Sequence, residues 1–257
     1  MNIKRRIMVL LVLGGACPAC AVEGEADVGE ATYAAMGFNG LGDNALTFNA
    51  FTYNGIDLAN GLAANGLNLG NGLGAVDLGD PLAHQFVEYL VSCVLPEGDA
   101  VEVGGESFAG GLGLAPEWAD GACDEDCQRW ASACLLARVN ARGEHVQLSM
   151  RGPHPALHPS SGELQAFARE EGTYFGNIFR PTQARWATSA RDDLTLPRSC
   201  GESVGPDGPV GPDGGCYVQV TGRSADVCES NSRAEGRRHC QDGDGVAWQQ
   251  GITVYLR

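Results

Sequence analysis

The clearest pattern of apolar and polar positions predicts a helix near residues 124–140. Cys127, Trp130 and Cys134 follow one another at offsets of three and four, so a helix places them on one stripe. The acidic run 124–126 suits a helix N-terminus, where carboxylates cap free amides and interact favourably with the helix dipole. We therefore expect this helix to be a core element that is stapled through its buried face.

Two more segments have helical periodicity together with a start signal. Pro81 begins a helix near 82–94, and Ser160-x-x-Glu163 is a capping box before a helix near 161–170. Alternation or buried apolar runs predict the strands. These strands are 101–103, 146–150, 173–179, 217–220 and 252–256.

Together these elements predict one α+β domain over residues 81–257, with about three helices against a mainly antiparallel sheet. The domain has about 177 residues, which is enough to bury a sizeable core. Disulfides would therefore reinforce the packing rather than replace it.

A low-complexity repeat precedes this domain, with Asn-Gly-Leu or a close variant mostly every five residues from 39 to 73. The period is similar to that of pentapeptide-repeat solenoids, but the asparagine lies two places before the apolar residue, which departs from that family. Seven units are too few to bury a core alone. We interpret residues 22–80 as an acidic leader and repeat spacer. The alternative is a small solenoid fragment packed on the main body.

Residues 1–21 have the organisation of a secretory signal peptide. Basic residues 4–6 precede the apolar run 7–13, and small residues follow at 19–21. Spanning a bilayer takes roughly 20 apolar residues, so a retained transmembrane anchor is not expected. Cys17 gives an alternative, since its surroundings partly match a bacterial lipoprotein processing site.

The charge balance excludes two classes of partner. The chain carries a net charge of −15, and removal of the three basic residues at 4–6 makes it −18. Such a chain repels nucleic acid and anionic lipid, so neither is expected as a partner.

Loss of the leader removes Cys17 and Cys20 and leaves eight of the ten cysteines. An even number in an exported chain predicts a disulfide framework, for which eight cysteines allow 105 pairings. Structural zinc is the alternative, but the paired C-x2-C spacing of such sites is missing. The expected disulfide-bonded residues are Cys93, Cys123, Cys127, Cys134, Cys200, Cys216, Cys228 and Cys240.

The predicted helices narrow these pairings. Cys93 ends one helix and Cys134 lies in the buried stripe of the next, so a bridge between them would join the two helices. Cys123 lies just before the second helix, so its backbone can bend to reach Cys127. The four cysteines between 200 and 240 are expected to pair among themselves, with their connectivity open.

Ser107 is the one candidate nucleophile. It lies one residue short of the G-x-S-x-G elbow, because Ala109 replaces the last glycine, and glycines 110–111 make a poor helix start. A triad with His145 or His154 is arithmetically open. The motifs HExxH, P-loop and GxGxxG are missing, which excludes the common zinc-peptidase and nucleotide-binding classes. We assign no catalytic residue and expect no cofactor.

Three other motifs have simple structural interpretations. His154 and His158 have metal-ligand spacing, but Pro155 between them favours a loop with two surface histidines. Residues 242–245 resemble part of a calcium loop without its distant glutamate, so a hairpin turn is favoured. The Gly-X-Y triplets at 205–214 are too few for a triple helix and predict a surface loop.

Five segments of the chain resemble a group of exported proteins from myxobacteria that often carry an Asn-Gly-Leu repeat before the globular part. These segments are 89–96, 113–118, 130–140, 171–179 and 252–256. The resemblance implies an envelope or extracellular location and carries over no catalytic residue.

Two functions from different classes therefore remain. The first is an exported, non-catalytic module that binds an extracellular polymer or an envelope protein. The second is a secreted hydrolase with an unidentified serine- or carboxylate-based site. Ser107 beside a histidine in a pocket, or two carboxylates converging in one, would favour the enzyme.

Overall fold

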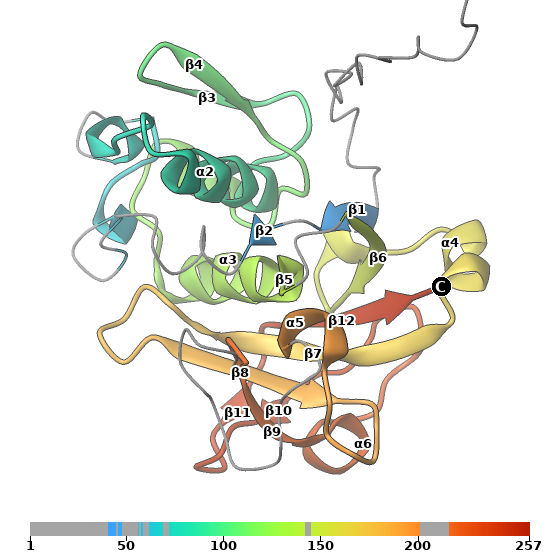
Figure 1. The fold of residues 1–257 in the computed structure, drawn as a ribbon. Helices are drawn as coiled ribbons and strands as arrows, with labels where there is room; N and C mark the ends of the chain where they lie inside the picture. The colour runs from blue at the N-terminus through green and yellow to red at the C-terminus, as the bar shows by residue number, and fades with distance from the viewer. Residues whose placement is uncertain are drawn as a thin grey trace, which may run out of the picture. The chain divides into compact units, whose positions relative to one another are not determined.

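A six-stranded sheet lies at the centre of the described chain, in the order β1-β6-β12-β7-β8-β9 (Figure 1). The computed structural model describes residues 41–44, 46–47, 56, 58, 62–68, 72–141, 145–200 and 216–257. Neighbouring strands are antiparallel except for the parallel pair β8–β9. The strands are β1 (Leu41–Asn44), β6 (Val146–Arg151), β7 (Arg169–Asn177), β8 (Ala184–Ser189), β9 (Gln219–Arg223) and β12 (Gly251–Leu256). The predicted α+β class is confirmed.

The three predicted helices are present and begin at the predicted signals. They are α2 (Pro81–Val94), α3 (Glu125–Arg138) and α4 (Ser161–Ala166). The side chain of Asp80 caps α2 and that of Asp124 caps α3, while Ser160 and Glu163 form the capping box of α4. Two one-turn helices, α5 (Pro197–Cys200) and α6 (Ser224–Val227), were not expected from the sequence.

Short elements complete the fold. A tight hairpin joins β3 (Ala100–Val103) to β4 (Glu106–Ala109). Its turn residues Gly104 and Gly105 have φ angles of +62° and +91°, which residues with a side chain rarely adopt. β2 (Leu46–Thr47) pairs in parallel with β5 (Val139–Asn140), and β10 (Cys240–Gln241) pairs with β11 (Ala247–Trp248). The 3-10 turns are η1 (Leu62–Ala64), η2 (Leu73–Ala75), η3 (Pro116–Ala119) and η4 (Pro155–Leu157).

The main core lies between the sheet and the two long helices. α3 packs against β7 and β12, and α2 packs on α3 and carries the β3–β4 hairpin (Figure 1). Trp118, Phe86 and Leu135 are among the largest fully buried side chains in this core. Both faces of the central strand β12 are buried as far as Tyr255, which explains its nearly continuous apolar sequence.

All eight cysteines of the predicted framework are paired. Cys93 joins α2 to Cys134 of α3, and Cys123 pairs with Cys127 at the start of α3, which are the two pairings that the sequence predicts. The other bridges are Cys200–Cys216 and Cys228–Cys240, both within the C-terminal four.

The described part of the repeat packs on the main body. Its buried leucines belong to the same core cluster as α2 and α3, and β1 forms an edge of the main sheet. These residues form short strands and 3-10 turns. The buried repeat leucines are Leu46, Leu58, Leu62, Leu67 and Leu73.

Several sequence predictions lie outside the described residues. They concern the signal peptide at 1–21, the lipoprotein alternative at Cys17, the acidic part of the leader and the Gly-X-Y triplets at 205–214.

Candidate functional site

A cavity of about 510 Å³ lies where β7 begins and β12 ends. Its volume is within the range of small-molecule sites, which is roughly 300–1,000 Å³. The lining combines apolar side chains from four segments with two carboxylates and three guanidinium groups. The lining residues are Val146, Arg169, Glu170, Glu171, Ala190, Arg191, Pro197, Arg198 and Leu256.

An irregularity in the sheet shapes this end of β7. Tyr255 of β12 pairs with Glu170 and Val254 pairs with Gly172, which leaves Glu171 as the extra residue of a bulge. Gly172 allows β7 to approach β8 closely here, because an added Cβ would lie 2.0 Å from the carbonyl oxygen of Thr188. The bulge therefore sets how Glu171 is presented beside the cavity.

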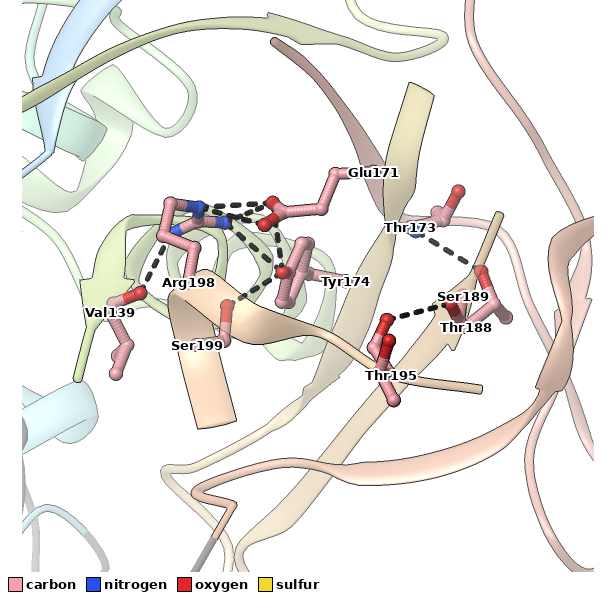
Figure 2. Close-up of polar contacts among 9 residues, drawn as sticks. All are labelled: Val139, Glu171, Thr173, Tyr174, Thr188, Ser189, Thr195, Arg198 and Ser199. Atoms are coloured by element: carbon pink, nitrogen blue, oxygen red, sulfur yellow. Dashed lines mark hydrogen bonds and ion pairs between the residues drawn. The ribbon is translucent and has the colours of Figure 1, made fainter. Parts of the chain in front are cut away.

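Arg198 of α5 and Glu171 of β7, which both line the cavity, form an ion pair (Figure 2). The Nη2 and Nε atoms of Arg198 donate to Oε2 of Glu171 at 2.6 and 3.0 Å, and both side chains are only 5% exposed. The remaining Nη1 donates to the carbonyl oxygen of Val139 at 2.7 Å. Burial lowers the pKa of Arg198, but its interactions with the carboxylate of Glu171 and with the hydroxyl of Tyr174 outweigh burial, and the pKa is raised.

Tyr174 extends this hydrogen-bonded cluster behind the cavity lining. Its hydroxyl lies 2.7 Å from Oγ of Ser199 and accepts a 3.0 Å hydrogen bond from Nη2 of Arg198 (Figure 2). The same hydroxyl donates to Oε2 of Glu171 at 3.2 Å. Burial raises the pKa of Tyr174, so the phenol stays neutral at physiological pH. The cluster is thus saturated with internal hydrogen bonds.

The second carboxylate, Glu170, is also occupied. Its two oxygens accept hydrogen bonds of 3.0 and 3.1 Å from Arg237. Arg191, which is exposed, pairs with Asp193, and hydrogen bonds from Arg191 and Thr195 lower the pKa of Asp193 to about 2. Both carboxylates of the lining are therefore held by arginines.

Ser107, the nucleophile candidate, is far from any such arrangement. It is exposed on β4, opposite Glu102 of the same hairpin. Among the described residues no hydrogen bond joins Ser107 to a histidine. The nearest histidine contact of the hairpin is the 2.9 Å pair between His84 and Glu106, which is also exposed. Ser107 therefore lacks the activating base that a serine nucleophile requires.

The three histidines considered for chemistry do not line the cavity. His154 and His158 bracket the turn η4, and His158 and His145 are exposed. The Nδ1 atom of His154 accepts a 3.2 Å hydrogen bond from the amide of Ala156, and its ring packs edge-on against Trp130. Burial lowers the pKa of His154. The described residues contain no group of three or more His, Cys, Asp or Glu that could hold a metal ion.

The acidic segment at 242–245 forms the predicted hairpin turn, between β10 and β11. The carboxylate of Asp242 accepts hydrogen bonds from the amides of Asp244 and Val246 at 3.0 and 2.9 Å. Its other oxygen accepts from the indole of Trp248 at 2.9 Å. These bonds fix the turn.

The ion pair of the cavity lining was not predicted from the sequence. Glu171 and Arg198 lie 27 residues apart, and each stands beside an element end rather than in a motif. The sequence does contain one signal for this ion pair, which is the acidic pair Glu170-Glu171 just before the apolar run 173–179. Carboxylates beside a buried strand require partners.

Comparisons with protein-family models, curated proteins and solved structures find no match to this chain. Within the part of the chain that the structure describes, none of the helices has the length and apolarity needed to cross a bilayer.

Proposed function

We propose that this protein is an exported, non-catalytic binding module that holds part of an extracellular polymer or of an envelope protein in the cavity beside β7 and β12. The observation that carries the proposal is a cavity of about 510 Å³ whose two lining carboxylates both already accept hydrogen bonds from arginines. A site of this kind offers shape, apolar surface and charge, which are properties of a binding site.

The state of the two carboxylates favours binding over hydrolysis. A general acid or base must be within hydrogen-bond reach of the proton that it transfers. Both oxygens of Glu171 accept hydrogen bonds from Arg198, and both oxygens of Glu170 accept them from Arg237. Neither carboxylate is thus free to serve a substrate without first breaking an ion pair.

The disulfides support the exported location. Four bridges in one chain are typical of proteins that fold in oxidising compartments. The basic, apolar and small regions of residues 1–21 have the order typical of a secretory leader, which also supports the proposal.

The proposal is tested by blocking the cavity. The purified full chain is titrated against isolated envelope material of the producing cells, beside variants Ala190→Trp and Ala109→Trp. Ala190 is an exposed residue of the cavity lining, and Ala109 is an exposed alanine on the β3–β4 hairpin. A bulky side chain in the site should weaken binding by about tenfold or more, whereas the control should bind like the wild type.

The alternative function is examined in the same preparations. The wild-type chain is screened with ester, peptide and glycoside substrates, together with Ser107→Ala and Glu170→Gln. Turnover that either substitution abolishes would overturn the binding-module proposal. Equal envelope binding by Ala190→Trp and the wild type would remove the cavity from it.

A further inference from the structure

The cavity has an excess of positive charge in an otherwise acidic protein. Its lining contains three arginines and two glutamates, although the whole chain has a net charge of −15. Arg198 is neutralised by Glu171, and Arg191 by the neighbouring Asp193. Arg169 alone among the lining cations has no carboxylate partner within the described residues. One guanidinium at the cavity is therefore uncompensated.

The surroundings of Arg169 do not supply the missing negative charge. Arg233 donates to the carbonyl oxygen of Ala168, the residue before Arg169, and has no carboxylate partner among the described residues. Arg257, the residue after Leu256 of the lining, donates to the neutral amide of Gln147 at 2.7 Å. Neither of these arginines lines the cavity, and neither supplies it with negative charge.

Glu170 does not compensate Arg169 either. It binds Arg237 through both oxygens, and its side chain is about four-fifths buried. A guanidinium without a carboxylate partner can bind an acid group of a ligand through charge-assisted hydrogen bonds. The cavity is therefore suited to an anionic group.

The rest of the lining is apolar. Val146, Pro197 and Leu256 come from three different elements and surround the same space as the charged groups. A ligand that places only an ion here would leave this apolar surface without contact. Burying an apolar body against it contributes about 25 cal/mol for each Å² removed from water.

We infer that the moiety held in the cavity is an apolar group that carries one acid group, with Arg169 binding the acid and the apolar body packing on Val146, Pro197 and Leu256. This inference rests on the proposed function and specifies the chemistry of the bound end of the polymer or envelope protein. It is compatible with the overall acidity of the chain, because the recognition is local and short in range.

Two fluorescent probes with the same aromatic body separate charge from apolar contact. They are 8-anilinonaphthalene-1-sulfonate, which carries one acid group, and uncharged N-phenyl-1-naphthylamine. Both are titrated into the full chain, into Arg169→Gln, into the cavity-blocking Ala190→Trp and into the control Arg180→Gln. Arg180 is an exposed arginine in the turn after β7, whereas Arg169 begins that strand.

Sulfonate binding should be tighter than binding of the neutral probe and should weaken about tenfold in Arg169→Gln, as expected for the loss of a charge-assisted hydrogen bond. The neutral probe should bind Arg169→Gln like the wild type, Arg180→Gln should leave both affinities unchanged, and Ala190→Trp should abolish both. Equal affinities for the two probes, or sulfonate binding unchanged in Arg169→Gln, would overturn the inference and leave the cavity as an uncharged binding site. Failure of both probes to bind would overturn the inference and also remove the cavity from the proposed function.

Discussion

The indole N–H of Trp118 donates a 3.0 Å hydrogen bond to the carbonyl oxygen of Asn65, which lies 53 residues earlier in the chain. The carbonyl oxygen of Trp118 in turn accepts a 2.9 Å hydrogen bond from the amide of Leu67. Trp118 is fully buried and packs edge-on against Phe179, so these bonds connect the repeat to the centre of the main body. The described repeat residues therefore contribute to the stability of the fold.

Substitution Leu67→Ala should lower the free energy of unfolding by about 2–5 kcal/mol, because Leu67 is buried in the main core and its truncation leaves a cavity there. Urea unfolding of the full chain measures the loss. Val246→Ala is the control, since Val246 is 55% exposed and its truncation should cost less than about 0.5 kcal/mol. Equal costs for the two variants would mean that the repeat adds little to the core.

The buried pair Arg198–Glu171 gives a second prediction. Arg198→Met should destabilise the fold by about 3–5 kcal/mol, because it leaves a buried carboxylate without its partner. Adding Glu171→Leu should recover part of that loss, since no uncompensated charge remains. Chemical denaturation of the two variants measures the coupling. Arg191→Met is the control, because it removes an exposed ion pair and should cost less than about 1 kcal/mol. No recovery in the double variant would show that the pair acts mainly through packing.

The disulfides should differ in their contribution according to the loops that they close. Cys93–Cys134 closes a separation of 41 residues and Cys123–Cys127 one of 4. The chain-entropy model then gives about 4 kcal/mol for the first and about 2 kcal/mol for the second. Thermal and urea unfolding of the two double-alanine variants compares them. A larger loss for the short loop would contradict the entropic account and indicate that its bridge mainly holds the start of α3.

Much of the secondary structure was predictable because its signals are local. The capping box of α4 and the Asp124 cap of α3 are each read from a few neighbouring residues, and both helices begin where these signals stand. Some ends were wrong, because tertiary contacts decide them. α3 ends at Arg138 rather than near 140, since Val139–Asn140 pairs with β2 of the repeat.

The end of β7 shows the same limit. The strand was expected over 173–179 but ends at Asn177, because the next two amides bind side chains instead of a neighbouring strand. The amide of Ile178 donates to Oγ of Ser132, and that of Phe179 donates to Oδ1 of Asn177. Ser132 lies 46 residues away from Ile178, so this competition cannot be read from the local sequence.

The candidate site was less predictable than the fold. It depends on the bulge at Glu171, on the insertion of β12 between β6 and β7, and on the ion pair across 27 residues. The bulge is a matter of strand register, which hydrophobic alternation fixes only to within the choice of face. The strand order and the ion pair depend on contacts between segments that are far apart in the sequence. Nucleophile motifs directed attention to Ser107, whereas the cavity lies at another sheet altogether.

The last prediction concerns pH and His154. Burial lowers the pKa of this histidine below 6.5, with the nearby charges of Asp126 and Glu117 opposing the shift. The unfolded chain therefore binds a proton more readily than the folded one, so stability is fully present above the unfolded pKa and is lost as pH falls through the lower folded pKa.

A hydrogen bond of His154 gives a second reason why stability should fall as the pH falls. The Nδ1 atom of His154 accepts the amide hydrogen of Ala156, and a protonated ring cannot accept that bond. Wild-type protein should consequently lose more stability between about pH 7 and pH 5 than His154→Gln, whose side-chain oxygen can still accept but does not titrate. Unfolding free energies of both proteins across this range measure the difference.

His158→Gln, which alters the exposed end of the same turn, serves as the control and should keep the pH dependence of the wild type. If His154 is responsible, removing its titrating ring must flatten the dependence of the unfolding free energy on pH. A pH dependence of His154→Gln that is parallel to that of the wild type would show that other groups cause the loss of stability at low pH.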